Sequence, residues 1–395
     1  MSSDAGPSLP ALTLRSRLPA VGTTIFTVMS ALAQEHRAIN LGQGFPDFDC
    51  DPRLVDAVTQ AMQAGHNQYP HMPGVLALRE GIAAKIASLY GHRYDPLTEI
   101  TVTAGATQAI LTAVLALVHP GDEVIVLEPC YDSYVPNIEL AGATAVRVPL
   151  GPDLRPDFDR LRSALSPRTR ALIVNTPHNP SGTAWTAAEM GELAACLRGT
   201  QALLIADEVY EHMVYDGALH QSVARHAELA ERSVLISSFG KTYHVTGWKV
   251  AYAAAPAALM SEFRKVHQFN VFTVNTPMQH ALAQYLADPA PYLELSGFYQ
   301  RKRDLFRAGL ASTGLRLMAC EGSYFQCVDY SAVSELPDTA FCRWLTTEIG
   351  VTAIPLSAFY DAAPAQRIAR FCFAKQDQTL EEALQRLRRG LAPGA

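Results

Sequence analysis

The feature that most constrains the fold is the regular alternation of short apolar runs with helix-length segments through the middle of the chain. Strands are expected at residues 100–103, 123–127, 143–148, 170–174, 202–206, 233–236 and 250–254. Helices are expected between them at residues 108–118, 133–140, 158–165 and 187–197. This alternation predicts an α/β fold with a mostly parallel, doubly wound sheet. Because ligands bind at the carboxyl ends of such strands, the residues that follow each strand are the first candidates for a site.

The segments on either side of this core predict a second, smaller α/β unit. The 395 residues are enough for two closely joined domains. The C-terminal third combines expected strands at 323–329, 351–354 and 368–373 with expected helices at 340–348 and 379–388. Residues 1–10 are expected to be disordered. We therefore expect residues 1–52 to form an N-terminal arm and part of the small domain, residues 53–289 the large ligand-binding domain, and residues 290–395 the small C-terminal domain.

Charge and cysteine content exclude several classes of partner. The formal net charge is -6 and no basic run is present, so nucleic acid is not expected as a partner. The seven cysteines are scattered and never form a C-x-x-C pair, which favours a reducing compartment and no structural zinc. Residues 1–18 lack the apolar core of a secretory signal, and the longest aliphatic stretch, residues 109–118, is too short to cross a bilayer. A cytoplasmic location without membrane attachment is expected.

A lysine in a loop rich in glycine, serine and threonine gives the first chemical lead. Residues 237–249 read Ser-Ser-Phe-Gly-Lys-Thr-Tyr-His-Val-Thr-Gly-Trp-Lys and follow an expected strand. Burial disfavours the ammonium form, and a neutral amine can form a Schiff base with an aldehyde cofactor. We expect Lys241 to be that imine lysine, with Ser238 and Lys249 holding a cofactor phosphate. The alternative is a surface loop with solvated lysines.

Two other strand ends carry groups that suit a flat, phosphorylated ligand. The turn at residues 103–107 opens a helix, and the backbone of Gly105, Ala106 and Thr107 would attract a phosphate. Tyr131 stands just past a strand end and could stack on a heteroaromatic ring. An ordinary tight turn and a core aromatic residue are the alternatives.

Two further strand ends carry polar groups at positions where an apolar strand stops. Asn179, in the turn at residues 175–182, could hydrogen-bond a phenolic oxygen or a substrate carboxylate, whereas His178 is expected to be structural. Asp207 ends an apolar strand, and a carboxylate there is costly to bury unless it meets a cation. A protonated pyridinium nitrogen is such a cation, and Tyr210 could reach the oxygen on the same ring.

Together these strand ends supply a Schiff-base lysine, a pyridinium carboxylate, a stacking ring, phosphate donors and a partner for a phenolic oxygen. Pyridoxal 5'-phosphate chemistry needs this set, so we expect that cofactor. Arg370 lies within an apolar strand pattern, where a guanidinium would pair bidentately with a carboxylate. We expect Arg370 to anchor an amino acid's α-carboxylate. An internal salt bridge is the alternative, and the nearby Arg367 competes for the role.

These motifs, taken in order, resemble the fold-type I pyridoxal-phosphate aminotransferases of class I/II. The resemblance is to the branch that holds bacterial methionine aminotransferase and the kynurenine and glutamine aminotransferases. It covers nearly the whole chain, through residues 22–26, 43–48, 67–69, 102–107, 175–181, 207–210 and the Lys241 loop.

The resemblance implies a homodimer with active sites shared across the interface. Tyr69 would reach the partner's phosphate, and the loop at Phe272 and Thr273 would border the partner's substrate pocket. Gly44, through its backbone, would hold the substrate carboxylate together with Asn179 and Arg370. Many class I relatives carry Arg where Lys249 stands, and either cation can face a phosphate. Kynurenine-active relatives carry His where Thr273 stands, which argues against strong kynurenine activity.

The expected activity is transfer of an amino group from an amino acid to a 2-oxo acid. Lys241 would move the proton as general base and acid, and Asp207 would stabilise the pyridinium. The side-chain pocket would draw on Ile25, Phe26, Tyr69, Tyr131 and Phe272. These residues offer no cation for a second carboxylate, so methionine, aromatic amino acids and glutamine are expected over aspartate.

Two other functions fit the same residues. A C–S β-lyase acting on cystathionine or cysteine conjugates uses the same fold and cofactor. A non-enzymatic regulatory module that binds the cofactor is the second alternative, although it would not need Lys241, Asp207 and Arg370 together.

Overall fold

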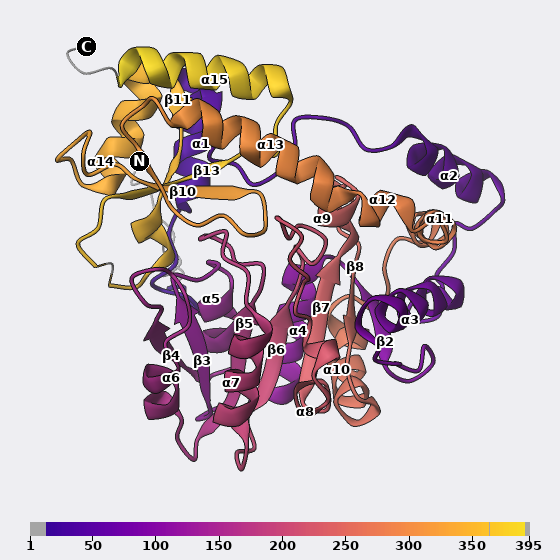
Figure 1. Cartoon of the computed structure of the whole chain (residues 1–395). Coiled ribbons are helices and arrows are strands. Elements are labelled where there is room, and N and C mark those ends of the chain that lie inside the picture. Colours follow the sequence, from indigo (N-terminus) through magenta and orange to yellow (C-terminus); the bar gives the residue numbers. More distant parts are fainter. Residues whose placement is uncertain (1–12, 363, 392–395) are drawn as a thin grey trace, which may run out of the picture.

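A computed structural model describes residues 13–362 and 364–391, and is organised around a seven-stranded sheet (Figure 1). The expectation of disorder at residues 1–10 lies outside the described residues. The strand order is β2-β8-β7-β6-β5-β3-β4. Only β8 runs antiparallel to its neighbours, so the prediction of a mostly parallel sheet is confirmed. The strands are β2 (Ile100–Thr103), β3 (Glu123–Glu128), β4 (Thr144–Pro149), β5 (Thr169–Asn175), β6 (Leu203–Asp207), β7 (Ser233–Ser238) and β8 (Ala251–Ala254).

Helices cover both faces of this sheet because successive strand side chains point to opposite sides. Val124 and Val126 enter one core with α4 (Ala106–Leu117), α5 (Tyr134–Leu140) and α10 (Ala257–Asn270). Ile125, between them, enters the core on the other face. That second core includes residues of α2 (Pro52–Gln63), α3 (Leu76–Tyr90), α6 (Phe158–Ala164), α7 (Ala187–Leu197), α8 (Ala227–Ala230), α9 (Phe239–Thr242), α11 (Thr276–Leu286) and α12 (Ala290–Leu293).

A second, antiparallel sheet lies beyond the carboxyl ends of the central strands (Figure 1). Its order is β12-β13-β10-β9, formed by β9 (Arg316–Leu317), β10 (Phe325–Asp329), β12 (Ile354–Pro355) and β13 (Ile368–Cys372). Beside it, β1 (Ile39–Asn40) pairs in parallel with β11 (Val351–Thr352). Four helices pack with these strands around a third core: α1 (Ile25–Glu35), α13 (Leu295–Leu310), α14 (Asp338–Trp344) and α15 (Asp377–Gly390). The division of the chain at residues 52 and 289 stays a prediction.

The C-terminal third departs from the expected strands in two places. The strand expected from residue 323 begins at Phe325, because Ser323 adopts a left-handed conformation with φ of 57° that a strand cannot continue. The single strand expected at residues 351–354 is two short ones, since Val351 pairs with Ile39 whereas Ile354 pairs with Arg370. The second difference comes from tertiary pairing rather than from local sequence preference.

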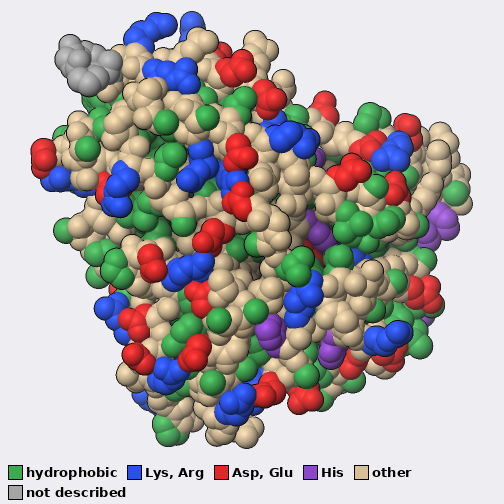
Figure 2. Space-filling view, in the orientation of Figure 1, with side chains coloured by type: hydrophobic (Ala, Val, Ile, Leu, Met, Phe, Trp, Pro, Cys, Tyr) green, Lys and Arg blue, Asp and Glu red, His purple; other side chains and the backbone are tan. Residues whose placement is uncertain are grey.

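The surface shows no concentration of one sign of charge on the face drawn in Figure 2, where acidic and basic side chains are interspersed. Within residues 13–362 and 364–391, no helix is both long and apolar enough to cross a membrane.

Candidate active site

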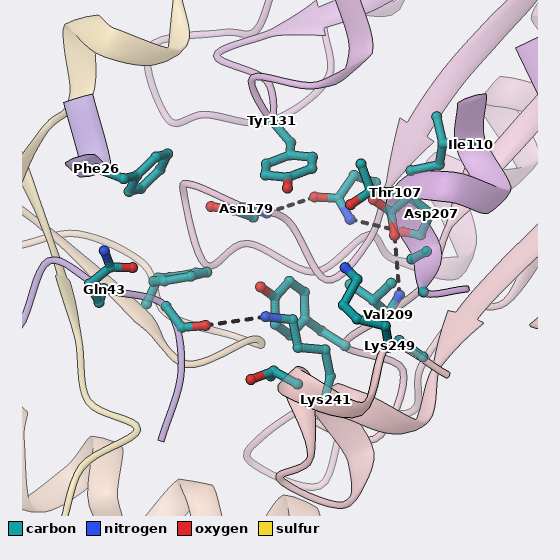
Figure 3. Close-up of a pocket in the computed structure, with 18 of the residues that line it drawn as sticks. Phe26, Gln43, Thr107, Ile110, Tyr131, Asn179, Asp207, Val209, Lys241 and Lys249 are labelled. Carbon is teal, nitrogen blue, oxygen red and sulfur yellow. Dashed lines mark hydrogen bonds between the residues drawn. The ribbon is translucent and has the colours of Figure 1, made fainter. Parts of the chain in front are cut away.

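A cavity of about 350 Å³ lies where the carboxyl ends of the central strands face the second sheet (Figure 3). Phe26, from α1, lies across this cavity from Asp207, at the end of β6. The site is therefore built by two cores that are far apart in sequence. The residues predicted for the site that line the cavity are Phe26, Gly44, Gly105, Ala106, Thr107, Tyr131, Asn179, Asp207, Tyr210, Ser238, Lys241, Lys249 and Arg370.

Lys241 enters the cavity from α9, the short helix that follows β7. Its Nζ donates hydrogen bonds to the backbone oxygen of Gly44 at 3.2 Å and to the hydroxyl of Tyr324 at 2.7 Å. Desolvation by the surrounding protein lowers the pKa of Lys241 from 10.5 to about 8. A substantial fraction of this amine is therefore neutral near physiological pH, as a nucleophile or general base requires.

Asp207 is a buried carboxylate with no cation beside it. It is 4% exposed, and no lysine, arginine or histidine in the described part of the chain lies within 4.0 Å of its oxygens. The hydroxyl of Tyr134 donates to Oδ2 at 2.6 Å, and the backbone N–H of Val209 donates to Oδ1 at 3.4 Å. Burial raises the pKa of Asp207 to about 6, because these hydrogen bonds only partly offset desolvation. Such a carboxylate is suited to a ligand that brings its own positive charge.

Asn175, at the end of β5, and Asn179, in the turn that follows, have different roles. Asn175 Oδ1 accepts from the backbone N–H of Asn179 at 2.7 Å, and its Nδ2 donates to the backbone oxygen of Asp207 at 2.8 Å. Asn175 thus ties two strand ends together and leaves the Asn179 side chain facing the cavity. His178 is buried against the Ser181 hydroxyl at 2.7 Å and its pKa is lowered to about 4 by desolvation. A neutral, hydrogen-bonded His178 fits the structural role expected for it.

A cradle for an anion lies at the N-terminus of α4, where Gly105 has φ of 82°. A Cβ at this glycine would lie 2.9 Å from both Cε and Nζ of Lys249, so only glycine lets the lysine reach this turn. The first N–H groups of a helix have no partners within the helix and carry partial positive charge. Ser238, at the end of β7, also lines the cavity.

Arg370 is a fully buried cation on β13, and no acidic side chain among the described residues forms an ion pair with it. Its Nη1 donates to Asn179 Oδ1 at 2.7 Å and its Nη2 donates to the backbone oxygen of Gly42 at 3.0 Å, while Nε has no partner among the described residues. Aromatic rings surround the guanidinium, with Phe325 at 4.0 Å, Phe359 at 4.9 Å and Phe26 at 5.3 Å from its centre. Arg367 instead pairs with Glu335. Arg370 is therefore the arginine available to a carboxylate ligand.

Three of the predicted residues do not line the cavity. Ile25 packs with the third core instead, although its neighbour Phe26 reaches the cavity. Tyr69 is 81% exposed, and its ring meets the ring of Phe272 edge to face at 5.3 Å between centroids. Phe272 is itself partly exposed and has φ of 69°, an unusual conformation for a bulky residue. Tyr69 and Phe272 thus form an exposed aromatic pair outside this chain's own cavity.

Some residues that shape the site carried no signal recognised in the sequence. Tyr134 holds Asp207 and Tyr324 holds Lys241, but both resemble ordinary core aromatics from the sequence. Others line the cavity without having been singled out: Gln43, Ile110, Val209, Thr246 and Phe325.

Two buried glutamates hold the turn after β6 in place. Glu208 accepts hydrogen bonds at 2.8 Å from His220 Nε2 and from the backbone N–H of Val223. Glu211 pairs with Lys85 Nζ at 2.6 Å and also accepts from Tyr90, Ser237 and Tyr252. Asp207 directly precedes Glu208, and Tyr210 lies between Glu208 and Glu211. The two anchored glutamates therefore hold the side chains of Asp207 and Tyr210 toward the cavity.

A buried amine, a buried carboxylate and a helix N-terminus beside a lysine, all at the strand ends of an α/β sheet, are the features of a pyridoxal-phosphate enzyme. The chain matches the family described as "Aminotransferase class I and II" over residues 36–387, and it belongs to that family. Enzymes of this family are aminotransferases that depend on pyridoxal 5'-phosphate. The predicted family, fold, cofactor and enzyme class are therefore confirmed.

Comparison with individual proteins shows which aminotransferases the chain resembles. The chain is 52% identical to the methionine aminotransferase of Escherichia coli, over 95% of this chain and 97% of the relative. It is 44% identical to a probable N-succinyldiaminopimelate aminotransferase of Mycobacterium tuberculosis, over 94% and 97%. A crystal structure that identifies a methionine aminotransferase function in E. coli superposes with a TM-score of 0.95 at 51% identity, covering 96% of this chain and all of the other.

The residues present fit the cofactor. No cation of the described part of the chain lies within 4.0 Å of Asp207, which leaves room for a protonated ring nitrogen beside it. The approach of Lys249 to Gly105 places a cation beside the N-terminus of α4, where a phosphate would be favoured.

Proposed function

We propose that this aminotransferase accepts methionine and aromatic amino acids as amino donors, with glutamine as a further donor, and passes the amino group to a 2-oxo acid. The observation that carries the proposal is the charge distribution of the cavity. The cations that line it are Lys241, Lys249 and Arg370. If the first two serve the amine and the phosphate, only Arg370 remains for the substrate, which matches one carboxylate and not two.

The wall near Arg370 supports an apolar donor. Phe26 and Phe325 line the cavity and lie within 5.3 Å and 4.0 Å of the guanidinium. A side chain that extends from a carboxylate held at Arg370 would meet these rings, and Tyr131 lines the cavity as well. A thioether packs well against aromatic rings, so methionine suits this surface. The likeness to the E. coli methionine aminotransferase points the same way.

The positions described above support an assignment for each cofactor contact. We assign the ring nitrogen to Asp207, the ring oxygen to Asn179 and Tyr210, and the ring face to Tyr131. The phosphate is assigned to Gly105, Ala106, Thr107, Ser238 and Lys249 of this chain and to Tyr69 of the partner. When bound, pyridoxal 5'-phosphate supplies an aldehyde for the amino group and a ring that withdraws electrons from the substrate Cα.

The chain's own residues then hold the substrate and move its proton. Arg370, Asn179 and the Gly44 backbone orient the α-carboxylate, with the guanidinium already fixed by Asn179 Oδ1 and the Gly42 oxygen. The Lys241 amine would take the proton from the substrate Cα as general base and would return a proton to the bound cofactor as general acid. Because the pKa of Lys241 is about 8, the neutral amine and the ammonium are both present at a pH near this value.

A homodimer with shared sites is part of the proposal, supported by the exposed Tyr69–Phe272 pair. We propose the cytoplasm as the location, supported by seven free cysteines. Mixing Lys241→Ala protomers with Tyr69→Ala protomers tests the shared site. A hybrid dimer then contains one site with intact Lys241 and the partner's intact Tyr69, so activity should return on mixing. Two inactive variants that stay inactive after mixing, although hybrids form, would contradict the shared site.

The experiment that tests the proposal is the visible absorption of the cofactor-loaded protein before and after addition of methionine without a 2-oxo acid. Methionine should remove the yellow band, convert the cofactor to its amine form and yield one equivalent of the 2-oxo acid. Lys241→Ala should abolish the conversion. A panel including phenylalanine, glutamine, N-succinyldiaminopimelate and aspartate ranks donors, and a preference for aspartate would overturn the assignment. Pyruvate release from cystathionine would instead reveal β-lyase activity.

A further inference from the structure

The amine of Lys241 is one corner of a closed triangle of hydrogen bonds that the roles proposed above leave unexplained. Nζ lies 2.7 Å from the Tyr324 hydroxyl and 3.2 Å from the Gly44 oxygen, and the same hydroxyl lies 2.5 Å from the Gly44 oxygen. A carbonyl oxygen can only accept, so the hydroxyl proton must point to Gly44. A lone pair of Tyr324 is therefore turned toward the lysine.

Tyr324 cannot easily move away from this position. It is 1% exposed, and its ring meets the rings of Tyr210 and Phe325 edge to face, at 5.1 Å and 4.9 Å between centroids. The backbone before it is held by the N–H of Ser323, which donates to the Met213 oxygen at 2.9 Å. The acceptor that faces Lys241 is thus fixed by packing before any ligand binds.

Gly44, the other acceptor, belongs to a loop that is also held. Lys375 Nζ donates to the backbone oxygen of Phe45 at 2.7 Å, one residue further along the loop. A Cβ at Gly44 would lie 2.9 Å from the ring of Phe325, so the loop packs directly on the segment that carries Tyr324. The two acceptors therefore form one rigid receptor for the amine.

We infer that Tyr324 is a positioning residue for transamination, whose hydroxyl holds the Lys241 amine whenever that amine is not bonded to the cofactor. This inference rests on the proposed function of Lys241. A free lysine side chain is flexible, and a fixed acceptor selects one of its conformations. An acceptor also binds the ammonium more strongly than the neutral amine, so Tyr324 helps the amine keep the proton that it takes from the substrate Cα.

A matched control stands next to Tyr324 in the same cluster. Tyr299 is fully buried, its ring lies 5.7 Å from that of Tyr324, and its hydroxyl has no hydrogen-bond partner among the described residues. Tyr299→Phe and Tyr324→Phe remove the same atom from the same core. Only Tyr324→Phe removes a contact with Lys241.

The first measurement uses the protein prepared without cofactor, so it does not depend on turnover. Acylation of Lys241 is followed against pH by mass spectrometry, which gives the pKa of its amine. Loss of a hydrogen bond to a charged group should lower that pKa by about one unit in Tyr324→Phe. Tyr299→Phe should leave it unchanged. Near-ultraviolet circular dichroism checks that both variants keep the packed core.

The second measurement separates positioning of Lys241 from support of Tyr210. With cofactor bound, kcat for the preferred donor should fall about 10- to 100-fold in Tyr324→Phe, less than the roughly 10²- to 10⁴-fold that general acid–base catalysis contributes, because Lys241 itself remains. KM and cofactor affinity should stay close to wild type. An unchanged labelling pKa together with weakened cofactor binding would overturn the inference, because Tyr324 would then act through Tyr210. If the wild-type enzyme turns over no amino acid, the proposed function and the proton transfer fail, whereas the labelling shift still reports the contact.

Discussion

The buried carboxylate of Asp207 should make the protein less stable when the cofactor is absent. Its pKa is raised from 3.8 to about 6 by burial. A difference of about 2 units corresponds to about 3 kcal/mol, at about 1.4 kcal/mol per unit. The folded state therefore binds the proton more tightly than the unfolded state. The contribution of protonated Asp207 to the free energy of unfolding is fully present below about pH 4. This contribution is lost as the pH rises through about 6.

Asp207→Asn removes the charge and keeps an oxygen that can accept from Tyr134. The variant prepared without cofactor should match wild type near pH 4 and exceed its free energy of unfolding by about 1–3 kcal/mol at pH 8. Urea unfolding at several pH values and one fixed protein concentration measures this difference. With cofactor bound the order should reverse, because the variant loses the partner of the ring nitrogen, and kcat should fall by about 100-fold or more.

A neighbouring carboxylate provides the control. Glu208 is as deeply buried as Asp207, but both of its oxygens accept short hydrogen bonds, at 2.8 Å from His220 Nε2 and from the Val223 N–H. Asp207 instead accepts one short bond from Tyr134 at 2.6 Å and one long bond from the Val209 N–H at 3.4 Å. Glu208→Gln should therefore destabilise the cofactor-free protein at pH 8, by about 1–3 kcal/mol. If Asp207→Asn is no more stable than wild type at pH 8, or behaves as Glu208→Gln does, then Asp207 is satisfied by the protein alone and the reasoning fails.

Two further substitutions test the support of the site and the substrate anchor. Glu211→Gln leaves Lys85 buried without its carboxylate partner and should lower the free energy of unfolding by about 3–5 kcal/mol, measured by urea unfolding at pH 7. Adding Lys85→Met should restore part of this loss. If Glu211→Gln causes no loss, the ion pair is dispensable. Attraction to Lys85 and the hydrogen bonds it accepts lower the pKa of Glu211 despite burial, so this stabilisation is present at neutral pH and disappears as the pH falls below about 4.3, the ordinary value for glutamate. Arg370→Lys cannot bind a carboxylate bidentately and should lower kcat/KM for methionine about 100-fold, an effect of about 2.7 kcal/mol, whereas Arg367→Lys should change it less than twofold; equal effects would remove Arg370 from the substrate site.

The sequence predicts that the strand-end residues meet in one place, because the relevant rule is local. Asn179, Asp207 and Lys241 each follow an apolar strand, and parallel strands bring their carboxyl ends to one edge. The central sheet and its helices were predicted for the same reason, since alternation of short strands and helices has few solutions.

The supporting contacts could not be predicted because they join residues that are far apart in sequence. Tyr324 meets Lys241 across 83 positions and Gly44 across 280. Lys85 meets Glu211 across 126 positions and looks like a surface lysine on a helix until the fold buries it. Strand ends are marked by composition, whereas these partners are chosen only by three-dimensional packing.

The construction of the site from two cores has a consequence for how its specificity can change. Asp207 ends strand β6 of the central sheet and Lys241 lies on α9, directly after β7, whereas Arg370, Phe26 and Phe325 stand on the smaller sheet or the helix beside it. Substitutions on the second side can alter which amino acid is preferred without touching the groups assigned to the cofactor. Evolution, or a protein engineer, can therefore redirect the same chemistry toward a new donor by remodelling the smaller core alone.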